Sequence, residues 1–455
     1  VACLLSLARL CFPQHSAHLW TVMLVIAKET AKISDNKGVV FEDINIAVER
    51  NEEKEQGDAN REAREEQLER RSLRRSILTK LKIVIAAWQI ASSTDTVLWQ
   101  IRFPPVFSKV TRLFGVLGFA IVDVGSMKCA FGWSYYDKLV FITMAPILAV
   151  AFFVSLYWLW QRHRGKTTTV EDRRRSINNI LYATLLFLYI VLPSISAYVV
   201  TYFSCGRFDR GDRSDLRVIA TELSVRCTST RYRRWLVYDG IMIALWPVGT
   251  LLGLATLLFK NRKKLNPQVN HALQTRMSSD PDGDVDGFQL EKRRHAQAMG
   301  ELSKLKVRNA DESLRGLEFL YEEYEPRCYL FPIFEMARRL FLSAVLAVFY
   351  PGSMQQVLVG LLGAMSSFLV YNHYEAFIED DDDMVASVAQ GQLVLIYFGA
   401  LAVYVSDVTD QKREVFSGAA FGVVLVLIFF TSFVVAAYTV MLNVFGDASL
   451  RTTSS

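Results

Sequence analysis

The stretch LFLSAVLAVFYPGSMQQVLVGLLGAMSSFLVYN, residues 340–372, decides the fold class of this chain. It contains no Asp, Glu, Lys or Arg, although 21% of all residues are charged. A helix in a soluble domain needs a polar face, whereas about 20 consecutive apolar residues match the hydrocarbon core of a bilayer. Pro351, Gly352 and Ser353 supply a turn signal in the middle of the stretch. The stretch therefore predicts two membrane helices joined by a tight turn.

Similar charge-free runs recur along the rest of the chain. They cover 139–160, 178–203, 240–259, 385–406 and 416–443. With their flanks, they predict seven membrane spans, at roughly 138–160, 178–203, 237–259, 329–350, 354–372, 386–406 and 416–443. A weaker eighth span covers 81–97, where Lys82, Gln89 and Asp95 interrupt an apolar run. We therefore predict an all-α, multi-pass integral membrane helix bundle with seven transmembrane helices, or eight if 81–97 crosses.

The segments outside the spans complete the predicted organisation. Residues 1–80 are an apolar remnant followed by a charged cytosolic helix, which is either a single solvated helix or a coiled coil. Residues 81–443 form the transmembrane domain, with a cytosolic insertion at 260–328, and 444–455 are a polar tail. Within the domain, 103–129 is too short and polar for a crossing and predicts a surface or re-entrant helix.

Loop charges give a preferred orientation in the membrane. The segments Arg70–Lys82, 161–177 and Lys260–Lys264 together carry slightly more Lys and Arg than the opposite side receives, which favours the cytosol for them. The loop 204–236 then lies outside, together with Cys205 and Cys227, where a disulfide can persist.

Signatures of soluble function classes are missing from the sequence. There is no P-loop, no H-E-x-x-H, no G-x-S-x-G and no dinucleotide fingerprint, and the six histidines are scattered. The net charge of +5 comes from bases interleaved with acids rather than from a basic stripe. We therefore predict neither an enzyme, nor a resident cofactor, nor a nucleic-acid partner. The expected partners are the lipid bilayer, cations and further copies of the chain.

Glu335, Arg338 and Arg339 are the most informative charged residues in the predicted spans. They occupy positions i, i+3 and i+4, so one helical face carries an acid and two bases just after Pro332. Charges inside a membrane helix often mark function. The alternative, which we favour on the sequence, is that they lie at the cytosolic interface with their charged ends in water.

An acidic run lies between two of the predicted spans. Its residues are Glu379, Asp380, Asp381, Asp382 and Asp383. Clustered carboxylates suit a divalent cation, but a bare run lacks the spaced carbonyl ligands of a calcium site. We favour a solvated loop and keep the run as a weak metal candidate.

A long series of short motifs gives the chain a resemblance to a known kind of membrane domain. The motifs are Lys82-Ile83, Gln89-Ile90-Ala91-Ser92-Ser93, Phe103-Pro104-Pro105-Val106-Phe107, Tyr135, Tyr136, Pro146, Phe203-Ser204-Cys205, Cys227, Tyr232, Trp235, Tyr238-Asp239-Gly240, Pro247-Val248-Gly249, Leu265-Asn266-Pro267, Phe319-Leu320-Tyr321, Tyr324-Glu325-Pro326, Glu335, Arg338-Arg339-Leu340, Pro351-Gly352-Ser353, Gln356, Ala386, Gln390 and Gln392. Over about residues 80–443, the chain resembles the C-terminal, TRP-channel-like membrane domain of large cell-surface proteins of unicellular eukaryotes. Those proteins usually carry cysteine-rich or EGF-like repeats ahead of the membrane region.

The resemblance implies cation permeation and a disulfide between Cys205 and Cys227. Cys129 is expected on the same side of the membrane and is a competing partner. A pore would use the last two spans. Gln390 and Gln392 lie on different faces of the first of these, so that one is a candidate for the pore wall and the other for a helix contact. Asp407 and Asp410 would attract cations at the mouth.

Two other function classes remain open on the sequence. No Gly-Asp-type selectivity filter precedes the last predicted span, which keeps a non-conducting anchor or receptor domain as an alternative. A transporter of small molecules or lipids is the third class. Cation currents in liposomes separate the first class from the second, and substrate flux without unitary currents indicates the third.

Overall fold

The computed structural model describes residues 58–115, 132–163, 170–208, 216–219, 222–268, 300–408 and 418–454. The chain divides into two compact units, one of residues 1–71 and 270–302, and the other of residues 72–269 and 303–455. Nearly all described residues belong to the second unit. The first contributes only the start of a helix and residues 300–302 to the described part.

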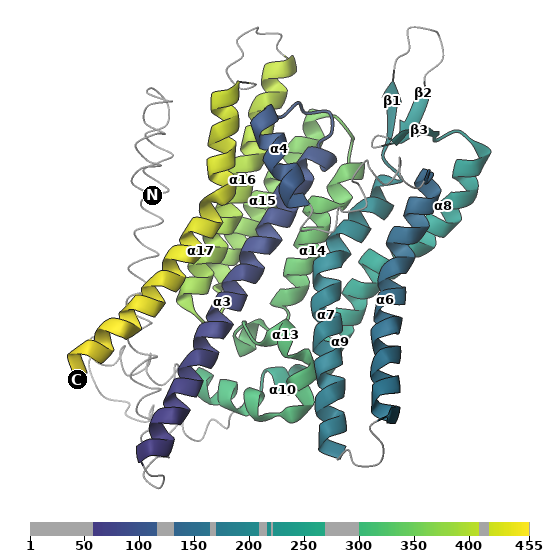
Figure 1. Cartoon of the computed structure of the whole chain (residues 1–455). Coiled ribbons are helices and arrows are strands. Elements are labelled where there is room, and N and C mark those ends of the chain that lie inside the picture. Colours follow the sequence, from purple (N-terminus) through teal and green to yellow (C-terminus); the bar gives the residue numbers. More distant parts are fainter. Residues whose placement is uncertain are drawn as a thin grey trace, which may run out of the picture. The chain divides into compact units, whose positions relative to one another are not determined.

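The second unit is a helix bundle with one small sheet (Figure 1). Its helices are α3 (Asp58–Val97, from residue 72 on), α4 (Pro105–Gly115), α6 (Tyr135–His163), α7 (Val170–Thr201), α8 (Thr230–Ile243), the π-helix η4 (Ala244–Gly249), α9 (Thr250–Lys260), α10 (Arg262–Leu265), η5 (Glu312–Leu317), α13 (Glu318–Tyr321), η6 (Pro326–Cys328), α14 (Phe331–Ser343), η7 (Val345–Val348), α15 (Met354–Tyr374), α16 (Asp380–Val408) and α17 (Ala419–Ser454).

Six helices in the described part are long and apolar enough to cross a membrane. They are Tyr135–Leu159, Ser176–Thr201, Thr230–Lys260, Met354–Tyr374, Asp380–Val408 and Ala419–Val444. Each corresponds to one predicted span, so the prediction of a mainly helical, multi-pass membrane protein is confirmed at that level. Large apolar side chains stand exposed on these helices, as on a surface that faces lipid: Leu148, Phe152, Phe153, Leu362, Leu369, Phe433 and Tyr438.

The seventh and eighth predicted spans are not confirmed. In place of 329–350, α14 has only 13 residues and ends at Ser343, where a short 3-10 helix follows. At 1.5 Å per residue it measures about 20 Å, less than the ~30 Å of a hydrocarbon core. Residues 81–97 are the end of α3, a 40-residue helix that is not among the six.

The turn predicted at residues 351–353 is present. Gly352 adopts φ +77°, a conformation that glycine accepts without strain. Ser353 is the N-cap of α15, and its hydroxyl accepts a bond from Gln356 N. The turn therefore starts α15 as expected, although the segment before it is a short helix rather than a full span.

The loop after α7 contains a sheet, which corrects the all-α prediction. Its three antiparallel strands are β1 (Cys205–Phe208), β2 (Leu216–Ile219) and β3 (Glu222–Arg226), in that order. Cys205 pairs with Ile219, and Val218 with Arg226.

Two hydrophobic clusters form the interior of the bundle. One joins α3, α4, α15, α16 and α17, and the other joins α6, α7, α8, α9 and α13. The segment predicted as a surface or re-entrant helix contributes α4, which buries Phe107 against Phe429 of α17. Helix α14 gives side chains to both clusters, Leu342 to the first and Met336 to the second. In Figure 1 it lies between the two sets of helices.

Candidate functional site

The three charged residues of α14 lie inside the bundle rather than at its surface. Glu335 is 4% exposed, Arg338 6% and Arg339 0%. Helix α14 contacts α7, α9 and α15, so its charged face has protein on all sides. The interface alternative that the sequence favoured does not describe these side chains, because their charged ends are buried too.

Glu335 is held by two phenol groups. The hydroxyl of Tyr189 on α7 donates to its Oε1 at 2.5 Å, and the hydroxyl of Tyr324 donates to its Oε2 at 2.5 Å. Hydrogen bonds to a carboxylate are stronger than bonds between neutral groups. Both oxygens are therefore fixed by residues from outside α14.

Arg339 is held between α7 and α3. Its guanidinium carbon lies 4.1 Å from the centroid of the Tyr189 ring, and its Nη2 donates to Gln89 Oε1. Gln89 in turn donates to the backbone oxygen of Ile190 at 3.3 Å. The Nε and Nη1 atoms of Arg339 are buried without a hydrogen-bond partner. The hydrogen-bond donors of this side chain are thus satisfied only in part.

Arg338 points toward α15 and α16. Its Nη1 donates to Gln390 Oε1 on α16 at 2.7 Å, and its guanidinium carbon lies 5.4 Å from the ring centroid of Tyr371 on α15. The two neighbouring arginines of α14 therefore bond to different helices, Arg338 to α16 and Arg339 to α3, and Arg339 also contacts α7.

A buried ion pair lies beside these residues. Lys82 Nζ of α3 lies 2.5 Å from Glu323 Oε1 and also donates to the backbone oxygen of Phe319 at 3.1 Å. Burial raises the pKa of Glu323, and the nearby charge of Lys82 opposes that rise. We call Lys82, Glu323, Glu335, Arg338 and Arg339 the α14 charge cluster. It contains three bases and two acids.

The structure places the predicted pore residues in different surroundings. Gln390 accepts the bond from Arg338, so it belongs to the surroundings of the cluster. Gln392 donates to the backbone oxygen of Phe429 at 2.9 Å, which joins α16 to α17. Asp407 is exposed near the end of α16, and Asp410 lies outside the described residues.

The acidic run is the first turn of α16 rather than a solvated loop. Asp382 is buried and pairs with Lys80 at 2.8 Å, and Glu379 lies 3.7 Å from the same amine. Asp381 accepts from Asn443, and the backbone N–H of Phe377 donates to Asp383. Acids suit the N-terminal turn of a helix. The described residues include no group of three or more His, Cys, Asp or Glu that could hold a metal ion.

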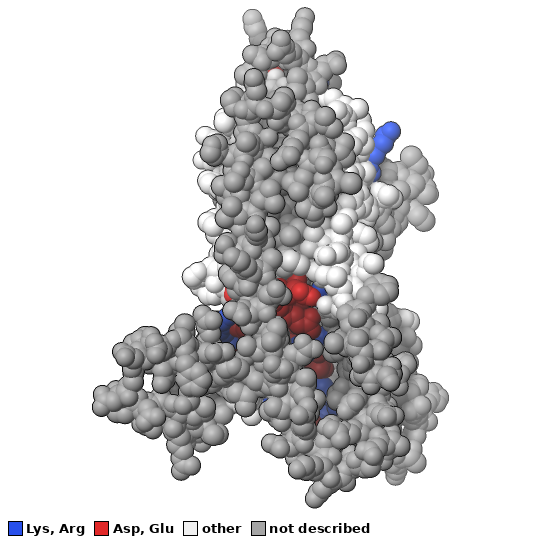
Figure 2. All heavy atoms as spheres, turned by 90° about the vertical axis from the view of Figure 1, so that its left-hand side faces the viewer, with Lys and Arg blue, Asp and Glu red and all other residues white. Residues whose placement is uncertain are grey.

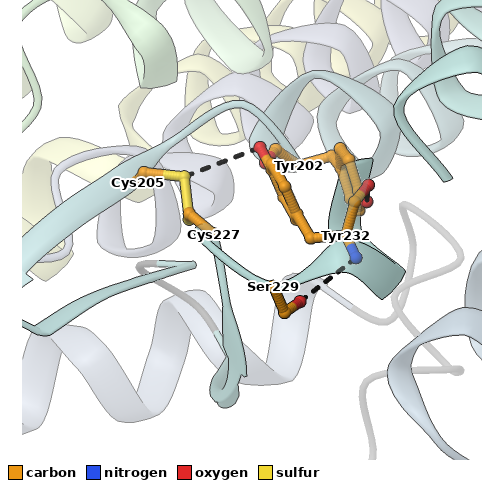
Figure 3. The surroundings of a disulfide bond; sticks show 5 residues. All are labelled: Tyr202, Cys205, Cys227, Ser229 and Tyr232. Atoms are coloured by element: carbon orange, nitrogen blue, oxygen red, sulfur yellow. Dashed lines mark hydrogen bonds between the residues drawn. A yellow bond between two sulfur atoms is a disulfide. The ribbon is translucent and has the colours of Figure 1, made fainter. Parts of the chain in front are cut away.

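The disulfide between Cys205 and Cys227 is present (Figure 3). It joins the start of β1 to the residue after β3, with Cα atoms 6.4 Å apart. Beside it, the rings of Tyr202 and Tyr232 stack with centroids 4.6 Å apart, and Ser229 caps α8 by accepting from Tyr232 N. Cys129 lies outside the described residues.

One pattern in the sequence pointed to residues that lie beside α14 in the structure. Lys82 and Gln89 are seven residues apart, so they share one face of α3. That spacing marks a polar stripe that must meet other polar groups inside the bundle. Tyr189 and Glu323 carried no such signal, because single residues of these types are common in membrane proteins and near their helix ends.

Comparison with known proteins gives no relative: no protein-family model, no curated protein and no solved structure matches this chain. Its function is therefore inferred from its own residues.

Proposed function

We propose that the chain is a TRP-like membrane protein that passes cations across the bilayer, and that the α14 charge cluster controls this passage. The observation that carries the proposal is the position of the cluster between two hydrophobic clusters, with side chains from both. Buried charges at membrane depth are expensive and commonly mark ion pathways or moving parts. Apolar packing would hold the two halves together equally well without them.

The cluster has the properties of a reversible contact. Arg338 bonds toward α16 while Arg339 bonds toward α3 and α7, so a shift of α14 must exchange partners on both sides together. Three guanidinium nitrogens without hydrogen-bond partners, Nε of Arg338 and both Nε and Nη1 of Arg339, are available for alternative bonds. Elements with two discrete bonded arrangements are what a gate requires.

Neutralising Glu335 is the sharpest test of this proposal. Glu335→Gln keeps the size of the side chain and an acceptor oxygen for Tyr189, but it removes the charge that balances the arginines. A change of about 1.4 kcal/mol alters a two-state ratio tenfold. Wild-type protein in liposomes should conduct cations, and the variant should change the open fraction by about this factor.

The matched control is Glu312→Gln, because the side chain of Glu312 is 61% exposed. It should conduct like the wild type. Equal currents from the Glu335 variant and the wild type would remove the cluster from gating. Absence of any cation flux through properly reconstituted wild-type protein would contradict the proposal as a whole.

One observation favours a non-conducting anchor as the second candidate. Gln390 and Gln392, the two amide side chains within α16, both form bonds with neighbouring side chains or backbone. A pore wall needs polar groups that are free to face water. Silent liposomes with a normally folded wild type would support this second candidate, and flux of a solute without unitary currents would indicate a transporter.

A further inference from the structure

Asp239 of α8 is a buried acid for which the structure provides no partner. It is 0% exposed, neither carboxylate oxygen has a hydrogen-bond partner, and no salt bridge joins it to a described basic residue. The other buried acids of the described chain are all paired: Glu323 with Lys82, Glu335 with two phenols, Asp382 with Lys80. An unpaired buried carboxylate is far too costly to leave uncompensated. Asp239 is therefore either protonated or balanced by a bound cation.

Aromatic residues with oxygen atoms surround Asp239. Its charge acts on Tyr135, Tyr202 and Tyr232. The hydroxyl of Tyr135 is itself buried without a hydrogen-bond partner. Its ring stacks on Tyr202 at 6.0 Å between centroids, and Tyr202 stacks on Tyr232 at 4.6 Å. Tyr232 and Asp239 are seven residues apart, so they share one face of α8.

The helix geometry next to Asp239 is also unusual. The π-helix η4 follows one turn later and contains Pro247. It also contains Trp246, whose indole N–H is buried without a partner. Single π-helical turns occur frequently at functional sites. This feature is independent of the unpaired carboxylate and points to the same place.

We propose that Asp239 and Tyr135 bind a hard monovalent cation, with Na⁺ as the probe. Carboxylate and hydroxyl oxygens are the ligands that such cations prefer, and ring faces attract positive charge. A single carboxylate balances one charge, and the described residues offer no group of three acidic, His or Cys ligands for a divalent ion. A proton would satisfy one carboxylate oxygen and leave the other and the Tyr135 hydroxyl unpaired, whereas a cation bound by both residues would satisfy all three oxygens. Lys138 of α6 is buried as well, and no ion pair between it and Asp239 is found in the described part of the chain.

The test is thermal unfolding of purified full-length protein at constant ionic strength, with Na⁺ replacing N-methyl-D-glucamine. The melting temperature of the wild type should rise with Na⁺ and saturate, because a ligand of the folded state stabilises it. Tyr135→Phe should raise the half-saturating Na⁺ concentration about fivefold, the effect of losing one neutral ligand. Asp239→Asn should abolish the Na⁺ dependence.

Glu312→Gln is the control, since the side chain of Glu312 is 61% exposed and the variant should keep the full response to Na⁺. A wild-type melting temperature that is indifferent to Na⁺ overturns the proposal. If it instead depends on pH, and Asp239→Asn removes that dependence, a proton occupies the site. Should the asparagine variant not fold, the wild-type titration and Tyr135→Phe still decide. The readout is independent of conduction, so this inference stands or fails apart from the proposed function.

Discussion

Tyr189 of α7 contacts an acid and a base of the same helix: its hydroxyl donates to Glu335, and its ring lies against the guanidinium of Arg339. The acid and the base are four residues apart on α14, one turn of helix. A single side chain of α7 therefore fixes the rotation of α14 about its own axis. This relationship makes the two functions of Tyr189 separable by mutation.

Tyr189→Phe should keep the ring contact and lose only the bond to Glu335. We expect the free energy of unfolding to fall by about 1.5–3 kcal/mol, the usual contribution of a hydrogen bond to a charged group. Tyr189→Leu should lower it further, because the Arg339 contact is lost too. Chemical unfolding in detergent measures both. Tyr438→Phe, on an exposed tyrosine, is the control; equal effects of phenylalanine and leucine would contradict a separate contribution of the ring.

The Lys82–Glu323 pair should be strongly coupled. Either Lys82→Met or Glu323→Gln alone leaves a buried partner unpaired and should destabilise the protein by about 3–5 kcal/mol. The double variant should be more stable than the sum of the single effects predicts. A double-mutant cycle of unfolding free energies measures this coupling. Strictly additive changes in the free energy of unfolding would show that the two charges do not interact.

Close packing of α15 on α16 depends on Gly360. A Cβ there would lie 2.6 Å from the ring of Tyr397 and 2.8 Å from Leu346, both fully buried. Gly360→Ala should therefore destabilise by about 1–3 kcal/mol. Gly253→Ala in α9 is the matched control, since nothing lies within 4 Å of its Cβ; it should gain about 0.5–1 kcal/mol from helix propensity. Loss of stability in both variants would rule out local crowding.

The disulfide should stabilise the sheet. Its cysteines are 22 residues apart, so Cys205→Ser should lower the free energy of unfolding by about 2–4 kcal/mol. The double serine variant should lose no more than the single one. Thermal unfolding with and without reductant measures this. A wild type unaffected by complete reduction would argue against a stabilising role.

Sidedness can be tested with two exposed serines of the described chain. Ser224 lies on β3 and Ser313 on η5. We expect the sheet outside and η5 in the cytosol. In a background that retains only the disulfide cysteines, an impermeant thiol reagent added to intact cells should label Ser224→Cys and not Ser313→Cys. The reverse pattern would invert the proposed orientation.

The membrane helices were predictable because hydropathy is a local property. The charge-free runs located six spans, and residues 351–353 marked the turn before α15. The span predicted at 329–350 is not confirmed, for a physical reason. The segment is as rich in apolar residues as a membrane span. Its charged face, however, is buried against partners such as Tyr189, 146 positions away, and these contacts permit a short internal helix.

The sheet and the charge cluster were less accessible to sequence reasoning. In β3, Glu222–Arg226, polar and apolar residues alternate, which is a strand signal. The many Arg and Asp residues around it obscured that alternation. The Lys82–Glu323 pair joins residues 241 positions apart, which no local pattern reveals. Asp239 stood out in the sequence only within the motif Tyr238-Asp239-Gly240, because a single acid at the edge of a predicted span resembles an ordinary surface residue.

The Cys205–Cys227 bond also has a mechanical consequence. It lies between the last turn of α7 and the first turn of α8, and the stacked rings of Tyr202 and Tyr232 tie the same two ends together. These helices consequently share a pivot. A movement of α8 relative to α7 therefore increases with distance from the sheet. Its amplitude is largest at the ends of the two helices that lie farthest from the sheet.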